Sequence, residues 1–528
     1  MPALSALPPL PSPATRLLDR EDIVLERGMM HLVHDSTTPA DARIADLLLV
    51  AAALEEAGIE PLLIRQNRTL PALVVDLAAA EAAMTAIAAV AAREPLYAKT
   101  KNRPAVLAQD TRAPAAEPTT IRFFRPRITA SGGRRYGASV GARVEFWRFG
   151  DETVDAPAAN ALLRKVTPAE DVAFDRVERY GRSWRTVAGM FDPQPDEFTG
   201  EVDLVFSWVD GSSSDFQRQR AAQMAEYVVG EGDEGPARYR HVDELRYALR
   251  SVHMHAPWVR RIFIATDSPA PAWLAEHPKV TIVRSEEFFA DPSVLPTHNS
   301  HAVEAQLHRI PGIAEHFLYS NDDMFFGRAV EPELFFSSAG VTKFVECGVR
   351  IGPGAPDVHR SGHDNGLRVN RALLRERFGR TIVRDLEHCA TPLRRSVMAE
   401  LEETFAEDFA RTAASRFRSA TDISVTNSLY HYYALMTGRA VSTRRPRVEY
   451  VQTTLANSLR RMDRLAERTD VDMFCLNDGG SSEVPEELRV PALRAALERM
   501  FPVRAPWEKT EISEEERAAR SAHPAGRG

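Results

Sequence analysis

The sequence predicts an α/β protein whose larger part is built on a doubly wound, mostly parallel sheet. Between residues 200 and 345, short runs rich in Val, Ile and Phe alternate with segments of helical periodicity. This is the pattern of parallel strands joined by helices. The chain has 528 residues, more than one ordinary core accommodates, so two or three domains are expected. We predict a small separate α/β domain over residues 20–195, a larger domain over residues 200–510, and disordered tails at 1–19 and 511–528.

The small N-terminal domain is predicted from one helix and several strands. Residues 41–58 carry a helical apolar stripe that ends at Gly58, a common helix stop. Apolar runs at 60–65 and 72–77 and an alternating run at 141–149 predict strands. We find no chemical motif in this domain, since isolated histidines such as His31 and His34 are more often structural.

The larger domain is predicted element by element. A strand at 202–207 runs into a turn at Asp210 and Gly211. The next expected elements are a helix at 242–259, a strand at 260–267, a short helix at 271–278, a strand at 279–289, a helix at 298–310 and a strand at 316–320. From residue 346 to 437 the chain is rich in Arg and mainly helical, which predicts a helical insertion.

The overall charge and the cysteine count exclude several classes of protein. The formal net charge is −8 and the isoelectric point is near 6.1, which argues against nucleic-acid binding. Three scattered cysteines are too few for a disulfide framework or a zinc knuckle, so a reducing compartment is expected. The N-terminus has no basic start and the Ala-rich run at 82–92 is too short to cross a bilayer. We expect a cytoplasmic protein that meets any lipid-linked substrate at the inner face of the plasma membrane.

Acidic and amide side chains follow three of the predicted strands. Asp210, Asp267 and the segment Asn321–Asp323 each lie at the carboxyl end of a strand, where ligands of doubly wound sheets bind. If the strand continues through this segment, Asn321 and Asp323 share one face and Asp322 takes the other. Oxygen ligands of this kind suit Mg²⁺ or Mn²⁺ bound together with substrate phosphates. The alternative is that these acids cap the following turn or pair with Arg328.

Two further groups of residues are candidates for chemistry. On a helix, His301, Glu304 and His308 share a face. Their spacing is not that of a zinc-protease motif. Three roles for Glu304 remain open from the sequence: a general base, a residue that supports the site, or part of a solvent-exposed helix face. A basic group follows in the insertion: Arg368, Arg371, His388, Arg416 and Arg418. Arginine forks suit phosphate oxygens and a histidine can move a proton near neutral pH. An acidic metal site with such a group suits phosphoryl transfer.

These motifs together resemble a known family. "VDLVFSWVDGSS", the run from "DELRYALRSV" to "YSNDDMFFGR", "LEHCATP" with "SRFRSATDIS", and "FCLNDG" are similar to the four characteristic regions of the Stealth family, near residues 201–215, 240–345, 365–440 and 470–510. Its members are hexose-1-phosphate transferases and include bacterial capsular polysaccharide phosphotransferases. The resemblance implies a Rossmann-like nucleotide-sugar transferase core. It also implies transfer of a hexose-1-phosphate, typically N-acetylhexosamine-1-phosphate, from a UDP-sugar to a glycan hydroxyl with release of UMP.

The resemblance also assigns site residues. It implies that Asp323, with Asn321 or Asp322, holds Mg²⁺, that Arg418 neutralises the phosphoryl group, and that His388 or Glu304 takes the acceptor proton. A phosphohistidine at His388 is the other option. The substrate-binding residues expected are Trp208, Asp210, Gly211, Asp267, Asn299, His301, Asn321, Arg368 and Arg371.

Two other functions remain open from the sequence. One is an ordinary metal-dependent glycosyltransferase that releases UDP, and the other is a non-catalytic polysaccharide-assembly protein. The N-terminal domain is expected to recognise the acceptor, to form a homodimer, or to dock at a membrane surface.

Overall fold

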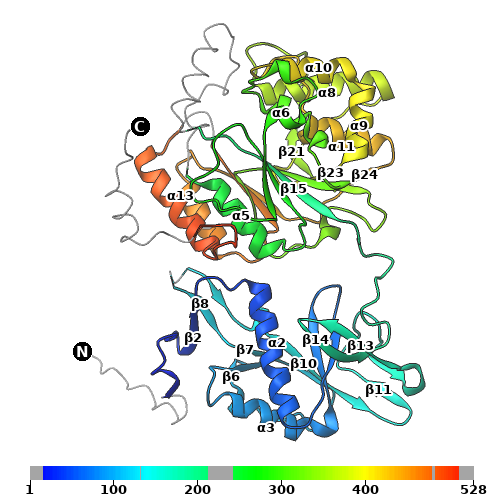
Figure 1. Ribbon diagram of the computed structural model, residues 1–528, viewed down its shortest axis with the longest axis vertical. Helices are drawn as coiled ribbons and strands as arrows, with labels where there is room; N and C mark the ends of the chain where they lie inside the picture. The colour runs from blue at the N-terminus through cyan, green and yellow to red at the C-terminus, as the bar shows by residue number, and fades with distance from the viewer. Residues whose placement is uncertain (1–15, 131–132, 212–241, 479–481, 510–528) are drawn as a thin grey trace, which may run out of the picture. The chain divides into compact units, whose positions relative to one another are not determined.

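The computed structural model describes residues 16–130, 133–211, 242–478 and 482–509 (Figure 1). The chain divides into two compact units. The first contains the residues up to Thr199 together with Leu497–Val503, and the second contains Gly200–Ala496 and the residues from Arg504 onward. Most of the two expected tails lies outside the described residues.

An eight-stranded mixed sheet is the framework of the first unit. It runs in the order β12 (Val166–Pro168), β11 (Thr153–Asp155), β10 (Ala142–Phe149), β7 (Thr119–Phe124), β5 (Tyr97–Thr100) and β6 (Val106–Leu107), and β4 (Pro71–Asp76) joins β10 to β3 (Leu62–Arg65). Helices α2 (Pro39–Glu56) and α3 (Ala80–Val90) share one apolar core with this sheet, in which Leu54 and Ile87 are fully buried with Phe146. The first unit therefore combines helices and strands around one apolar core.

Two smaller sheets complete the first unit. One has four strands: β1 (Ile23–Glu26), β2 (Met29–His34), β8 (Arg127–Thr129) and β9 (Arg135–Tyr136). The other is the hairpin of β13 (Phe174–Arg179) and β14 (Arg182–Val187).

The second unit is organised by a five-stranded sheet. Its order is β17 (Val280–Val283), β16 (Ile262–Ala265), β15 (Val202–Ser207), β18 (His316–Asn321) and β23 (Thr391–Arg394). The first four strands are parallel and β23 is antiparallel. The chain moves outward from β15 to β17 and then returns to the other side of β15 as β18, so the switch point of this sheet lies between β15 and β18. In such sheets ligands bind beyond the carboxyl ends of the strands at this point.

Helices and short sheets surround this core. The helices that begin in the second unit are α5 (Glu244–His255), α6 (Ser285–Phe288), α7 (Ser300–Glu304), α8 (Gly362–Phe378), α9 (Arg395–Thr404), α10 (Ala406–Ala414), α11 (Tyr430–Met436), α12 (Ser458–Glu467) and α13 (Glu486–Met500). Helices α8 to α11 are grouped together, mostly yellow in Figure 1, in the region for which a helical insertion was predicted. The remaining strands pair as β19 (Met324–Phe326) with β26 (Met473–Asn477) and β25 (Val448–Gln452), β20 (Thr342–Phe344) with β24 (Ala440–Ser442), and β21 (Glu346–Arg350) with β22 (Arg384–Leu386).

Two of the predicted helices differ in the structure. The helix expected at 271–278 is absent because this segment pairs with a distant one: Leu274 forms an antiparallel bridge with Glu508, and the Lys509 amide donates to the carbonyl oxygen of Trp273. The helix expected at 298–310 ends at Glu304, and a separate 3₁₀ turn, Leu307–Arg309, follows. His308 therefore does not share a helix face with His301 and Glu304. Among the described residues, no helix combines the length and apolar character needed to span a bilayer.

Candidate active site

The carboxyl ends of the central strands meet in register. Ser207, the last residue of β15, lies opposite Ala265 of β16 on one side and Asn321 of β18 on the other. Asp267 follows β16 by two residues, and Asp322 and Asp323 follow β18. The expectation that these acidic strand ends meet at one edge of the sheet is confirmed.

Asp323 has an incomplete set of partners. Its Oδ2 accepts from Asn477 Nδ2 at 3.3 Å and from Cys475 Sγ at 3.5 Å, both on β26. Its Oδ1 is buried and has no hydrogen-bond partner among the described residues. Burial raises the pKa of this carboxyl, and attraction to His388 opposes the rise. A buried carboxylate oxygen without a partner is costly, so Asp323 is suited to receive a cation.

The strand-face argument for this segment is wrong. Strand β18 ends at Asn321, and Asp322 and Asp323 form the turn that leads into β19. The alternation of side chains therefore does not apply to these two residues. Arg328 pairs with Asp472, its Nε lying 2.7 Å from Oδ1.

His388 lies in the loop between β22 and β23, close to Asp323. Burial lowers the pKa of His388, and the neighbouring His363 lowers it further, whereas Asp323 and Asp385 act in the opposite direction. Its ring centroid is 5.2 Å from that of Tyr450, whose hydroxyl donates to Asn477 Oδ1 at 3.0 Å. The structure thus brings His388, Asp323 and Asn477 together from three distant segments.

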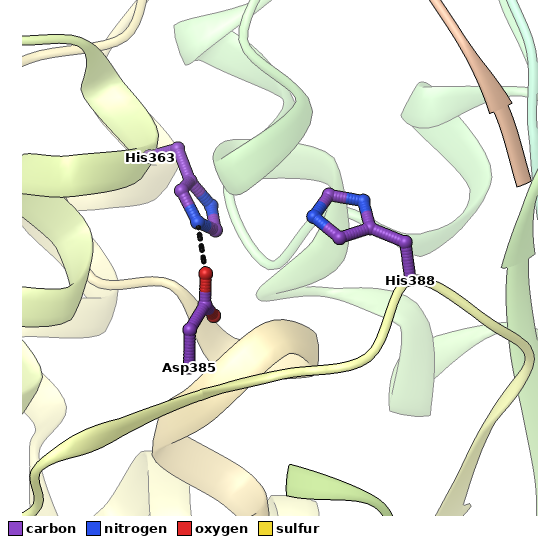
Figure 2. Close-up of side chains that lie close together, drawn as sticks. All are labelled: His363, Asp385 and His388. Atoms are coloured by element: carbon purple, nitrogen blue, oxygen red, sulfur yellow. Dashed lines mark hydrogen bonds and ion pairs between the residues drawn. The ribbon is translucent and has the colours of Figure 1, made fainter. Parts of the chain in front are cut away.

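His388 also belongs to a cluster with His363 and Asp385. Figure 2 shows the two rings and the carboxylate directed into one space. His363 Nε2 donates to Asp385 Oδ2 at 2.8 Å. The first turn of α8 presents His363, because Ser361 caps this helix by accepting from the Asp364 amide at 3.1 Å.

Glu304 begins a second network on the other side of the strand end. It is 2% exposed, and its Oε2 accepts from Thr426 Oγ1 at 2.6 Å. Its Oε1 lies 3.3 Å from the Tyr319 hydroxyl, which in turn lies 2.8 Å from Asn321 Oδ1 and 2.8 Å from Ser207 Oγ. Burial raises the pKa of Glu304 despite these hydrogen bonds. A continuous chain of hydrogen bonds therefore connects Glu304 with the ends of β15 and β18.

Thr426 reaches Glu304 from a π-helical turn. Residues Val425–Leu429 form this turn immediately before α11. Such turns occur frequently at functional sites. Its preceding residue, Ser424, is held by Asn370, which accepts from the Ser424 amide and donates to its carbonyl oxygen.

Arg418 lies beside Glu304, on a loop that is held in place by hydrogen bonds. Its guanidinium donates to Ser300 Oγ at 2.8 Å. Asn299 Nδ2 holds the loop by donating to the carbonyl oxygens of Ser415 and Phe417 and to Asp422 Oδ2. The stem of Arg418 passes so close to Gly362 that a Cβ there would lie 2.7 Å from it. The first turn of α8 therefore contacts Arg418 through Gly362 and approaches His388 through His363.

Comparisons with known proteins identify the family. Models of three Stealth conserved regions match residues 238–344 (region 2), 387–435 (region 3) and 463–519 (region 4). The exopolysaccharide phosphotransferase CpsY of Mycobacterium tuberculosis is 52% identical over 491 residues, which are 92% of each chain. The chain belongs to the Stealth family. An exopolysaccharide phosphotransferase of Nocardia farcinica is 52% identical over 89% of this chain and 88% of its own. The expected class of enzyme, a phosphotransferase, is thereby confirmed.

The likeness to solved structures is weak. A crystal structure of the galactosyltransferase LgtC with donor and acceptor sugar analogues covers 60% of this chain and 99% of its own, at 12% identity and a TM-score of 0.29.

The structure places the remaining predicted residues of this Stealth protein as follows. Trp208 is buried, the Asp210 amide donates to Ser268 Oγ at 2.9 Å, and Gly211 follows in the same turn. Asp267 is exposed and accepts from the Ser285 amide at 2.8 Å, at the start of α6. His301 is buried with its Nδ1 3.9 Å from Asp422 Oδ2. These residues lie at or next to the strand ends or to the loop of Arg418.

Two of the predicted arginines have partners within the helical insertion. Arg368 pairs with Asp364 one turn earlier on α8 and is 4% exposed. Arg371 donates to the carbonyl oxygens of Ile351, Gly352 and Gly354. Both arginines hold α8 to the preceding loop, and their role in substrate binding stays a prediction.

Several residues of the site had no place in the sequence prediction. They are His363, Asp385, Asn477, Asp478, Tyr319 and Thr426. Asp478 accepts from Arg489 at 2.8 Å and contributes to the raised pKa of Asp323. The sequence "FCLND" could have pointed to Asp478, because an apolar run followed by Asn and Asp has the same pattern as the strand that ends at Asn321.

Proposed function

We propose that this chain transfers a hexose-1-phosphate, such as N-acetylhexosamine-1-phosphate, from a UDP-sugar to a hydroxyl group of a glycan. In this reaction the acceptor oxygen forms a bond to the sugar-bearing phosphorus, the bond to the UMP oxygen breaks, and UMP leaves. The relatives named exopolysaccharide phosphotransferases support a product in exopolysaccharide synthesis. The observation that carries the proposal is the approach of Asp323 and His388 beyond the switch point of the sheet.

Asp323 is the residue that we propose to hold Mg²⁺ or Mn²⁺. Its buried Oδ1 has no protein partner among the described residues, and a hard cation prefers such oxygen ligands. Asp322 and Asn321 precede it at the same strand end, and Asp478 is a neighbouring carboxylate. When bound, the ion would neutralise charge on the diphosphate and its leaving oxygen.

Arg418 is proposed to neutralise the transferred phosphoryl group. A guanidinium donates two parallel hydrogen bonds to phosphate oxygens. Ser300, Asn299 and Asp422 fix the loop and the direction of this side chain. We propose a positioning role for Asn299 and His301 through this loop.

His388 is proposed as the base that takes the acceptor proton. Burial lowers its pKa, which favours the neutral ring that a general base requires. Both oxygens of Glu304 are occupied within the protein, so we assign Glu304 to positioning Tyr319 and Asn321. Trp208, Asp210, Gly211 and Asp267 are proposed to contact the UDP-sugar. The free cysteines suit our proposal that transfer takes place in the cytoplasm, at the inner face of the plasma membrane.

The released nucleotide tests this function. The purified chain is incubated with Mg²⁺, a panel of UDP-sugars and cell-wall glycan fragments, and the nucleotides are separated by chromatography. We expect UMP together with a phosphodiester-linked sugar on the acceptor, and neither product from Asp323→Asn. Release of UDP without UMP would identify the ordinary glycosyltransferase instead. A chain that binds donor and acceptor but forms no product would identify the assembly protein.

A further inference from the structure

The cluster of His363, Asp385 and His388 has the composition of a transition-metal site. One ligand atom from each residue lies within 4.8 Å of the other two (Figure 2). His363 Nε2 and Asp385 Oδ2 already face each other at 2.8 Å. Two histidines and one carboxylate with open positions bind divalent transition metals in many proteins.

Each ligand comes from an ordered element. His363 is in the first turn of α8, Asp385 is in β22, and His388 is in the short loop that follows. The backbone amide of Leu386 donates to Asp385 Oδ1 at 2.8 Å, which leaves Oδ2 directed at His363. Outer hydrogen bonds of this kind orient metal ligands.

Metal binding would displace the proton that His363 Nε2 shares with Asp385 Oδ2, and this proton is released to solvent.

We propose that His363 Nε2, Asp385 Oδ2 and one ring nitrogen of His388 bind a divalent transition-metal ion of the Zn²⁺ class, and that this ion inhibits transfer. The inhibitory part rests on the proposed function, because it assumes that His388 takes the acceptor proton. A ring nitrogen that is bound to a metal no longer has a lone pair for that proton. Mg²⁺ prefers oxygen ligands and water, so it does not compete for the two imidazoles.

This site is distinct from the one proposed for Mg²⁺ at Asp323. The match to family region 2 ends at residue 344, and the match to region 3 begins at residue 387. His363 and Asp385 lie in the interval between them. Asp323 influences His388 electrostatically but is not one of the three ligands.

Metal binding is measured without reference to activity. The full chain, freed of metal with a chelator, is titrated with Co²⁺ while its visible absorption is followed, and with Zn²⁺ by calorimetry. We expect one ion with a Kd of about 1 μM or tighter. His363→Ala and Asp385→Asn should each weaken binding by at least about ten-fold. The matched control His359→Ala removes an exposed histidine three residues before α8 and should bind like the wild type.

Three results of this titration would overturn the proposal. They are a wild type that does not bind, a His363→Ala variant that binds as well as the wild type, and a site that is lost in Asp323→Asn but kept in His363→Ala. Circular dichroism and melting temperature exclude unfolding as the cause of a loss. His363→Gln, which keeps a side chain of similar length, is the second variant if His363→Ala does not fold.

Inhibition is measured by UMP release in excess Mg²⁺. Zn²⁺ should inhibit the wild type near its Kd, and His363→Ala should require at least about ten-fold more Zn²⁺ relative to its own zinc-free rate. Zinc binding without inhibition would overturn the inhibitory role, whereas the proposed metal site itself would still stand. If the wild type releases no UMP with any donor, the proposed function fails, and the titration still decides whether the metal site exists.

Discussion

Asp323 and Glu304 are two buried carboxyl groups on either side of the same strand end, and their surroundings differ. Both oxygens of Glu304 have partners, Thr426 at 2.6 Å and Tyr319 at 3.3 Å. Asp323 has two weaker contacts on Oδ2, at 3.3 and 3.5 Å, and none on Oδ1. Burial raises the pKa of both groups. The protein therefore satisfies one acid and leaves the other short of partners.

This difference separates positioning from direct participation. A satisfied buried carboxyl gains stability from its hydrogen bonds, whereas an unsatisfied one costs stability until a ligand arrives. Asp323 is thus expected to matter for activity at little or no cost to folding when it is replaced. Glu304 is expected to matter for both. The following changes test this contrast, from the largest expected effect on activity to the smallest.

Asp323→Asn should produce the largest loss of activity. The amide keeps the size of the side chain and removes the charge that we propose holds the divalent ion. UMP release should fall by about 10³-fold or more, since a metal contributes several kcal/mol to charge stabilisation. The melting temperature should stay the same or rise, because a buried charge is removed. A large fall in melting temperature would instead make Asp323 a structural residue.

Arg418→Lys should produce the next largest loss. Lysine keeps the charge but lacks the planar fork, and its shorter reach removes the contact with Ser300. We expect UMP release to fall by about 10²-fold, a common loss for one donor to a developing anion. Arg416→Lys, two residues earlier on the same loop, is the matched control and should retain activity. Equal losses in both variants would show that the loop as a whole matters, and not the guanidinium of Arg418.

Thr426→Val should lower both stability and activity. It leaves Glu304 Oε2 buried without its 2.6 Å partner, which costs about 1 to 3 kcal/mol. We expect a lower melting temperature and UMP release reduced by about ten-fold through displacement of Tyr319 and Asn321. Thr426→Ser keeps the hydroxyl and should restore both. A normal melting temperature with lost activity would place Glu304 in direct contact with substrate.

The sequence alone was sufficient to predict where the central strands end. It was insufficient to predict which residues from other segments contact these strand ends. The apolar runs before Ser207, Ala265 and Asn321 are local signals, and parallel pairing of short strands aligns their ends without further information. The helix expected at 271–278 failed because residues 507–509 pair with it across more than two hundred positions, which no local propensity records. The strand-face argument failed because the chain turns directly after Asn321.

The missed site residues share one property. His363, Asp385 and Asn477 reach Asp323 and His388 from segments separated by long stretches of chain, so their proximity depends on tertiary packing. Glu304 and Arg418 were predicted individually from the family resemblance, but the loop that joins them through Asn299 and Asp422 was not. Motifs identify residues that carry chemistry, whereas the residues that orient them become visible only in three dimensions.

Asp422→Asn should have the smallest effect, visible in the pH dependence of stability. Burial raises the pKa of Asp422 from 3.8 to about 6, so the folded state holds this proton more tightly than the unfolded state. The wild type therefore loses stability as the pH rises from about 4 to about 6, by at most about 3 kcal/mol, and the penalty stays constant above that range. Asparagine does not titrate, and its carbonyl oxygen accepts from the Ser419 amide and Asn299 as Oδ2 does in the wild type. The melting temperature of the variant should accordingly exceed that of the wild type by an amount that grows between pH 4 and pH 6. Glu407→Gln, at an exposed acid on α10, should show no such growth. A difference that shrinks with rising pH would mean that Asp422 is stabilised as a carboxylate, and that its charge, not its hydrogen bonds, holds the loop of Arg418.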